Sequence, residues 1–153
     1  MRPEMKVIGA AAVIAELRNI AEVVPDNARK VMHRGADRIV KEAKLNTPVD
    51  THNLEESIRK EVDREATGGK RLKIDIAVGG IVDGVNVDEY AAEVHEAYET
   101  SVAPNGPGPG TKEKMQANPG RQIGSKFLER AVETEQPKFI KALIDAVTTA
   151  TRT

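Results

Sequence analysis

The sequence contains no cysteine and no tryptophan, and its only aromatic residues of the Phe, Trp and Tyr class are two phenylalanines and two tyrosines. Without cysteine, the chain can form neither a disulfide framework nor a thiolate centre. It also lacks an apolar run of the roughly 20 residues that a membrane-spanning helix needs, and it lacks the basic and apolar regions of a signal peptide. We therefore expect a soluble protein that is made in the cytoplasm and has no membrane partner.

The scarcity of aromatic side chains also limits the kind of core that the chain can build. A length of 153 residues is typical of one domain, here 1–153, and 39% of the residues are hydrophobic. The core must be built mainly from Ala, Val, Ile and Leu, which suits thin layers of helix on sheet better than a deep enclosed pocket. The net charge of −1 argues neither for nor against a polyanionic partner.

Motifs of catalysis and of cofactor binding are also missing. The three histidines, His33, His52 and His95, lie on separate segments and show no spacing typical of metal ligands. No Gly-x-Ser-x-Gly nucleophile elbow and no phosphate-binding Gly-x-x-x-x-Gly-Lys-Ser/Thr loop is present. We therefore expect no enzyme activity, no catalytic residue, no cofactor and no metal site.

Two amphipathic helices are predicted in the first third of the chain. Apolar residues recur at helical spacing from Ala10 to Val24, and Pro25 is expected to end that helix. The second helix, over 27–46, has the clearest periodicity in the sequence, with a buried face of small and aliphatic residues. Its opposite face, on which we expect His33 to be exposed, is basic and includes Arg29, Lys30, Arg34, Arg38 and Lys41.

The basic face has two interpretations. It is either an ordinary solvated surface or a surface that meets DNA phosphate or an acidic neighbouring protein. Aromatic side chains do not alternate with the basic ones, so stacking on nucleic-acid bases is not expected.

The pattern changes from helix to strand at 47–58. Pro48 cannot continue the helix and favours extended geometry at Thr47. Asp50 or Thr51 is then placed to cap a short helix that leads into the first strand. In its simplest interpretation, this stretch is only a helix stop followed by a restart.

Strands are predicted next, over 58–64 and 72–78. Leu72, Ile74, Ile76 and Val78 alternate with other residues, as in a half-buried antiparallel strand. Thr67 to Lys70 is typical of the hairpin turn between the two strands, and Asp83-Gly84 predicts a further turn.

The helical spacing returns at 88–99, where the polar residues are acidic. The following segment, about 100–123, is rich in Pro and Gly, and its stretch from Val102 to Gly110 is not expected to form regular helix. Long loops of this kind are usually functional or disordered. We interpret it as a flexible assembly arm that orders against a neighbouring subunit, the alternative being a floppy surface loop. The residues assigned to the arm are Pro104, Gly106, Pro107, Gly108, Pro109, Gly110, Lys112, Lys114 and Arg121.

Two helical blocks complete the prediction. Ser125 is expected to cap the first block, and Pro137 is expected in the first turn of the final helix. The last residues, from Thr148, are expected to fray. The fold class predicted is α+β, with a small antiparallel sheet and helices packed mainly on one of its faces.

Several of these segments resemble the phage tail-component family, the small neck or tail-completion proteins of long-tailed bacteriophages. The likeness covers nearly the whole chain, although His52 stands where that family usually has Gly, and His95 to Ala97 depart from its second motif. The matching residues are Pro48, Val49, Asp50, Thr51, Asn53, Leu54, Tyr90, Ala91, Phe127 and Leu128.

The resemblance implies a structural protein of the virion. Copies would form a ring, expected to be hexameric, at the neck or the top of the tail. The ring would be assembled in the host cytoplasm. The partners implied are other copies of the chain, head-side connector or adaptor proteins, and the tail tube or tail terminator protein. Genomic DNA would pass through the ring without sequence-specific contacts. The alternative function is a small DNA-binding module that uses the basic face of the helix over 27–46.

Overall fold

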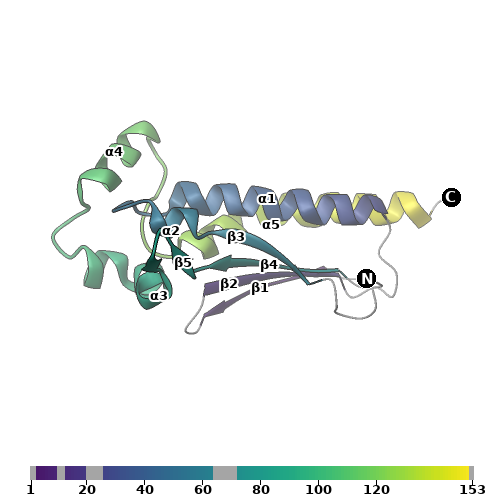
Figure 1. Cartoon of the computed structure of the whole chain (residues 1–153). Helices are drawn as coiled ribbons and strands as arrows, with labels where there is room; N and C mark the ends of the chain where they lie inside the picture. The colour runs from purple at the N-terminus through teal and green to yellow at the C-terminus, as the bar shows by residue number, and fades with distance from the viewer. Residues whose placement is uncertain (1–2, 10–12, 20–25, 64–71, 152–153) are drawn as a thin grey trace.

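The computed structural model describes residues 3–9, 13–19, 26–63 and 72–151, and its fold is α+β, as predicted. A four-stranded antiparallel sheet is covered on one face by two long helices, and the short helices and a small hairpin gather at one end (Figure 1). This end of the molecule, built from residues 47–58 and 79–126, is called the distal end below.

The sheet is formed by β1 (Pro3–Gly9), β2 (Val13–Asn19), β3 (Arg59–Asp63) and β4 (Leu72–Val78), in the order β1-β2-β4-β3. The predicted alternation in β4 is confirmed, because Leu72, Ile74, Ile76 and Val78 are all buried. The hairpin turn predicted at 67–70 lies outside the described residues.

The first predicted helix, over Ala10 to Val24, is wrong where the structure describes it, because Val13–Asn19 is the strand β2 and pairs antiparallel with β1. The rest of the predicted helix and its expected end at Pro25 lie outside the described residues. The apolar spacing of this segment fits both periods, and pairing with β4 decides between them. Ala15 lies opposite Ile76, and Leu17 lies opposite Ile74. The alternate residues of β2 therefore occupy the same register lines as the buried residues of β4, which a helix would not do.

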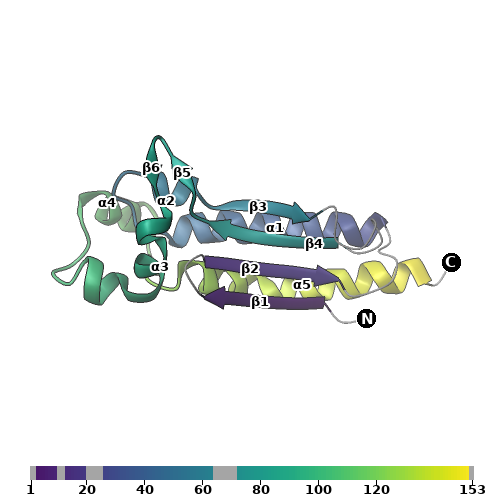
Figure 2. The ribbon, with the colours of Figure 1, turned by 60° about the horizontal axis from the view of Figure 1, so that its bottom comes forward.

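The helical layer consists of α1 (Asp26–Asn46), as predicted, and α5 (Phe127–Thr151). The two helices run antiparallel, with α1 over β3 and β4 and α5 over β1 and β2 (Figure 2). They approach closely at Gly35, where an added Cβ would lie 2.3 Å from Cδ2 of Phe139. Glycine at this position therefore permits the close packing of the two helices.

The C-terminal block is one helix rather than two. Pro137 lies inside α5 and not in a first turn, and the helix continues to Thr151 instead of fraying from Thr148. Proline removes one backbone donor and crowds the preceding turn. The apolar stripe that includes Phe139 and Leu143, both buried against α1 and the sheet, supports the helix on the far side of Pro137.

The distal end contains the short elements α2 (Asn53–Glu56), β5 (Ile81–Val82), β6 (Val85–Asn86), α3 (Asp88–Ala97), the π-helix η1 (Tyr98–Val102) and α4 (Pro109–Ala117). Asp83 and Gly84 form the predicted turn between β5 and β6, and both have positive φ angles, of 49° and 77°. This pair of angles is the geometry that matches the twist of a two-residue hairpin.

The prediction that 102–110 contains no regular helix is wrong at both ends of the stretch. Val102 closes η1, and Pro109 is a first-turn residue of α4. Proline is well tolerated there, since its missing N–H would have no partner in the first turn. Gly110 also belongs to α4, and an added Cβ on it would lie 3.0 Å from the Val49 carbonyl oxygen.

Candidate interaction surfaces

The stretch 47–58, where the chain passes from helix to strand, is called the junction below. Its motif residues lie at the distal end and divide into a buried and an exposed group. Pro48, Val49, Asn53 and Leu54 are buried, whereas Asp50 and Thr51 are exposed. Neither exposed residue caps α2, because His52 stands at the cap position and no side chain caps the helix. The predicted capping role of Asp50 or Thr51 is therefore wrong.

The remaining motif residues are spread between the groove described below and the core. Tyr90 is half-buried and Ala91 is buried on α3, while Phe127 and Leu128 are fully buried at the start of α5. The structure brings Tyr90 close to the junction but places Phe127 and Leu128 beneath it, in the hydrophobic core.

His52 adopts a left-handed backbone conformation, with φ of 65° and ψ of −5°. Its exposed imidazole lies 3.7 Å from the Glu55 carboxylate. An exposed contact of this kind contributes little to the free energy of unfolding. A residue with a Cβ pays a free-energy penalty in this conformation that glycine does not pay.

We expect His52→Gly to raise the free energy of unfolding by about 1 kcal/mol, because glycine adopts left-handed angles without steric conflict. Urea denaturation followed by circular dichroism measures the change. His52→Ala is the control, because it removes the imidazole but keeps the Cβ. An equal gain in both variants would show that the side-chain contact, and not the backbone, is responsible.

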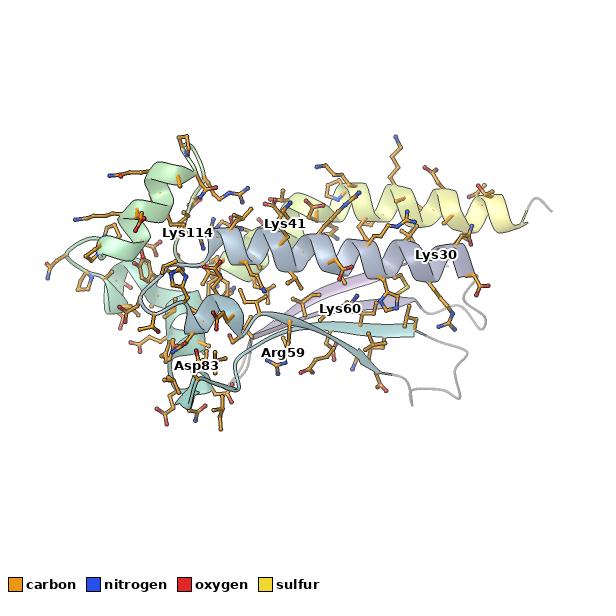
Figure 3. The ribbon with its side chains drawn as sticks, turned by 45° about the horizontal axis from the view of Figure 1, so that its top comes forward. Lys30, Lys41, Arg59, Lys60, Asp83 and Lys114 are labelled. Carbon is orange, nitrogen blue, oxygen red and sulfur yellow. The ribbon has the colours of Figure 1, made fainter. Side chains whose placement is uncertain are left out.

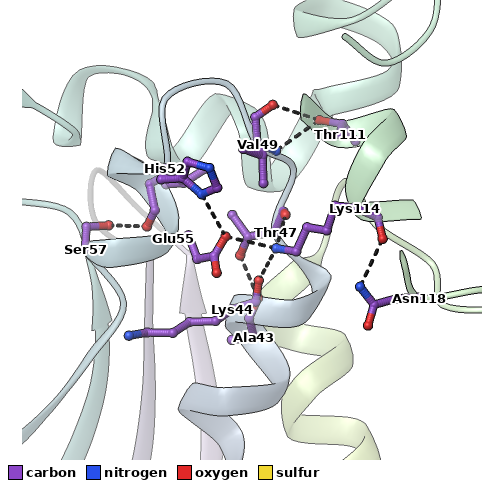
Figure 4. Close-up of polar contacts among 11 residues, drawn as sticks. Ala43, Lys44, Thr47, Val49, His52, Glu55, Ser57, Thr111, Lys114 and Asn118 are labelled. Carbon is purple, nitrogen blue, oxygen red and sulfur yellow. Dashed lines mark hydrogen bonds and ion pairs between the residues drawn. The ribbon is translucent and has the colours of Figure 1, made fainter. Parts of the chain in front are cut away.

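Helix α4 is fastened to the junction through Thr111 (Figure 4). The Thr111 hydroxyl donates to the Val49 carbonyl and accepts from the Val49 N–H, both at 3.0 Å, and the Tyr98 hydroxyl lies 3.3 Å away. Thr111 is only 1% exposed. These two hydrogen bonds satisfy the backbone N–H and carbonyl of Val49, which is buried and belongs to no helix or strand.

Lys114 makes the second attachment of α4. Its ammonium group donates to the carbonyl oxygens of Thr47, at 2.8 Å, and of Lys44, and it lies 3.1 Å from the Glu55 carboxylate (Figure 4). The Lys44 carbonyl lies in the last turn of α1 and the Thr47 carbonyl just beyond it, where helices run out of backbone donors. The Lys44 carbonyl also accepts the Thr47 N–H, at 3.3 Å. Burial lowers the pKa of Lys114, and the hydrogen bond to Glu55 opposes that effect.

Arg121 ties the end of the segment to α1. Its guanidinium donates to the Glu42 carboxylate at 2.8 Å and to the Asn46 side-chain oxygen at 2.9 Å. Lys114 and Arg121, both assigned to the assembly arm from the sequence, thus contact their own chain. The exposed remainder of the arm comprises Pro104, Gly106, Gly108, Pro109 and Lys112, with Pro107 and Gly110 half-buried.

A groove of about 770 Å³ lies between the junction and the segment that follows α3. We call it the distal groove. Apolar and aromatic residues form much of its lining, including Val49, Leu54, Val94 and Tyr98. The acidic residues in its lining are Asp50 and Glu93, and His52 also lines it. None of the described residues that line the groove is Lys or Arg.

The surface around the distal groove is acidic. Lys126 pairs with Glu96, and the Glu99 carboxylate accepts the Ser125 N–H. Asp50 and Tyr90 both line the groove, where burial raises the pKa of Tyr90 and the charge of Asp50 raises it further. The exposed carboxylates of the distal end are Asp50, Glu56, Asp83, Asp88, Glu89, Glu93, Glu96, Glu99 and Glu113.

The opposite charge is concentrated on α1 (Figure 3). Lys30, Arg34, Arg38 and Lys41 follow one another at intervals of three or four residues, so they form one stripe along the helix. We call them the α1 stripe. All four are exposed, and within the described parts of the chain none of them forms a side-chain hydrogen bond or ion pair.

Other residues of the predicted basic face have different surroundings. Arg29 is half-buried and has a partner of its own. His33, expected to be exposed, is half-buried, and its Nδ1 lies 3.1 Å from the Lys60 ammonium. Lys60 also pairs with Asp37, at 2.9 Å, so the strand side of α1 is neutralised whereas the α1 stripe is not.

His95 connects α3 to the start of α5. Its imidazole is 2% exposed and meets the Phe127 ring edge to face, with ring centroids 4.9 Å apart. Nε2 lies 3.5 Å from the Glu129 N–H in the first turn of α5, and Nδ1 lies 2.9 Å from the Glu96 carboxylate. His95, and not the predicted Ser125, therefore offers a side-chain acceptor to the helix start.

This arrangement requires a neutral imidazole. A proton on Nε2 would oppose the Glu129 N–H and would meet the positive end of the α5 dipole. Burial lowers the pKa of His95, and the hydrogen bond to Glu96 only partly offsets it, while nearby Lys126 lowers it and Glu129 raises it.

We therefore expect acid to destabilise the fold through His95. The unfolded chain binds a proton near pH 6.5 and the folded chain only at lower pH, so stability falls as pH drops below about 6.5, by at most about 1.4 kcal/mol per pH unit for one proton. Denaturation midpoints between neutral and mildly acidic pH measure this slope. His95→Gln should flatten it, and His52→Gln should leave it in place, because the His52 side chain is exposed. An unchanged slope in His95→Gln would contradict the assignment.

Neither a metal site nor a membrane-spanning helix is found in the part of the chain that the structure describes. No group of three or more His, Cys, Asp or Glu side chains is placed to hold a metal ion within residues 3–9, 13–19, 26–63 and 72–151. No helix in the same parts of the chain is both long enough and apolar enough to cross a membrane.

The sequence also has a match among known families. A family model described as "Bacteriophage HK97-gp10, putative tail-component" matches residues 11–94, which is more than half of the 153 residues. No curated protein and no solved structure matches the chain. The matched segment contains α1, the junction, the strands β3 and β4 and most of α3.

Proposed function

The chain belongs to the HK97-gp10-like family of bacteriophage tail components, and from that premise we propose that it is a structural protein whose copies form a ring at the neck or the top of the tail. Family membership makes it a phage structural component that interacts with other virion proteins. The ring, its place in the virion and its role around the DNA channel are the content of the proposal.

The observation that carries the proposal is the separation of charge on one subunit. The α1 stripe is basic and has no intramolecular partner within the described residues, whereas the distal end is acidic. Two surfaces of opposite charge on one subunit favour a heterologous, head-to-tail contact between copies. Such contacts generate a closed ring when the rotation from one copy to the next adds up to a full turn.

The segment that follows α3 has a narrower role in this proposal than the sequence suggested. Helix α4 is bound to its own subunit through Thr111 and Lys114, so the part that can reach a neighbour is the exposed loop around Pro104, Asn105 and Gly106. This loop borders the distal groove. The loop and the groove together would form the contact with the next copy in the ring.

The ring would join the head-side connector to the tail tube or tail terminator protein, and genomic DNA would pass through its centre. Near-neutral net charge suits a channel that must not hold DNA tightly. Such a protein works by shape and contact and needs no catalytic group, which agrees with its family of structural tail components.

Electron microscopy of phage particles that carry a tagged copy of the chain tests the proposal. We expect the tag density to form a ring between head and tail. Phage that lacks the chain should yield heads and tails that are not joined. The absence of the chain from purified, complete particles would exclude a structural role in the virion.

A second candidate function is DNA binding by the α1 stripe, favoured by its four cations, which have no partner among the described residues. Binding to duplex phosphate would weaken with salt, with a slope of about −0.9 for each phosphate neutralised. A titration of the monomer with duplex DNA at several salt concentrations distinguishes the two functions. Tight binding with a steep salt slope favours the DNA-binding function, and weak binding favours the ring.

A further inference from the structure

The distal groove has the composition of a site for a cationic side chain with an apolar stem. Tyr90 and Tyr98 contribute aromatic rings, and the carboxylates of Asp50 and Glu93 are its anionic groups. Glu93 is itself held in place by a hydrogen bond from the Ser101 hydroxyl. A guanidinium group can pair with carboxylates and stack on aromatic faces at the same time, which an ammonium group does less well.

Exposed apolar side chains also gather at the distal end. Of the four large hydrophobic residues described as exposed, three lie at the distal end: Ile81 at 77%, Val85 at 41% and Val102 at 44%. Val85 and Val102 line the groove directly. Apolar residues gathered beside polar ones on a surface are typical of a protein contact.

The α1 stripe has complementary properties. Arg34 and Arg38 are its two central members, one helical turn apart, and Lys30 and Lys41 flank them. The four side chains span about 16 Å along the helix, from the rise of about 1.5 Å per residue. Their long stems can cover apolar surface while their charged ends reach carboxylates.

We propose that the distal groove of one subunit receives Arg34 and Arg38 from the α1 stripe of a second copy of this chain. The inference rests on the proposed ring and deepens it by assigning the two surfaces that meet. Guanidinium groups would lie between Asp50 and Glu93 and against the tyrosine rings, while Lys30 and Lys41 would face the surrounding carboxylates of the distal end.

A second copy fits the groove better than DNA does. The groove and its surroundings are acidic, so phosphate would be repelled there, whereas the α1 stripe has the opposite sign and is present on every copy. The contact joins two different surfaces of identical subunits. An open chain of copies therefore keeps one free groove at one end and one free stripe at the other until the ring closes.

Charge reversal tests the pairing. One variant carries Asp50→Lys and Glu93→Lys, a second carries Arg34→Glu and Arg38→Glu, and a third carries all four changes. Each is supplied to cells infected with phage that lacks its own copy of the gene, and the yield of joined head–tail particles is counted. Sedimentation velocity of each purified variant reports self-association, and thermal melting confirms folding.

We expect each two-residue reversal to lower the yield of joined particles at least about tenfold, because like charges would then face each other across the contact. The four-residue variant should recover most of that loss, since its groove is basic and its stripe is acidic. Lys138→Glu with Lys141→Glu is the matched control, as both lysines are exposed on α5, and it should keep the full yield.

Two results would overturn the inference: wild-type yield from either two-residue reversal, or no recovery in the four-residue variant. The second result would mean that the two surfaces bind different partners. Imaging of the wild-type particles separates this failure from failure of the proposed function. A ring that persists in the reversed variants rejects only the groove assignment, whereas particles without the chain reject the ring itself.

Discussion

Replacing Phe127 with alanine is expected to lower the free energy of unfolding by about 4 kcal/mol. Phe127 is fully buried at the first turn of α5, and among the residues whose burial is described it is the largest fully buried side chain. Its ring packs edge to face against His95, and such aromatic pairs contribute about 1 kcal/mol beyond their buried area. The substitution would leave a cavity where α3 meets α5, and it would remove the support of the imidazole that caps α5.

Urea denaturation at neutral pH measures this loss. Phe127→Leu keeps most of the buried volume and should cost about 1.5 kcal/mol or less. Ile144→Ala is the control for the helix as a whole, because Ile144 is 52% exposed on α5 and its truncation should change stability by no more than about 0.5 kcal/mol. Similar losses from Phe127→Ala and Ile144→Ala would contradict the core position of Phe127.

The elements that the sequence predicts well are those with one clear period and local stop signals. Helix α1 repeats its apolar residues over many turns and ends before Pro48, and β4 alternates from Leu72 to Val78. The Asp83-Gly84 turn follows from local backbone preferences alone. Neighbouring residues in the sequence are sufficient to determine each of these features.

The hairpin of β1 and β2 could not be predicted in this way. The residues from Val13 to Leu17 fit a helical stripe as well as a strand, and the choice depends on pairing with β4, more than 50 residues further along the chain. Pro137 shows the opposite case: a local helix breaker is tolerated because the residues after it pack against α1. In both cases the tertiary contacts override the local preference.

The candidate surfaces show the same division. The α1 stripe can be found from the sequence, since its four residues share one face of one helix. The distal groove cannot, because its lining is drawn from the junction, α3 and the segment after α3. His52 carried the best available signal: the resembling family has Gly at this place, and the residue proves to have a positive φ angle.

Lys114→Met is expected to lower the free energy of unfolding by about 2 kcal/mol, because Lys114 makes charge-assisted hydrogen bonds that methionine cannot replace. The Lys114 side chain is 12% exposed, and its ammonium group serves two carbonyls at the end of α1 as well as the Glu55 carboxylate. Methionine keeps the stem but leaves the buried Thr47 carbonyl without this donor. The loss should appear first as detachment of α4 and not as unfolding of the sheet.

Hydrogen exchange distinguishes local detachment from global unfolding, since amides of α4 would lose protection while those of β4 keep it. Lys112→Met is the matched control: Lys112 lies on the same helix two residues earlier, is exposed, and has no hydrogen-bond or ion-pair partner for its side chain within the described chain. Equal protection of α4 in the Lys114 and Lys112 variants would show that Thr111 alone holds the helix. A selective loss in Lys114→Met would instead show that this one cation holds α4 against the end of α1, and that the neighbour-facing loop beside the distal groove is presented by an anchored helix.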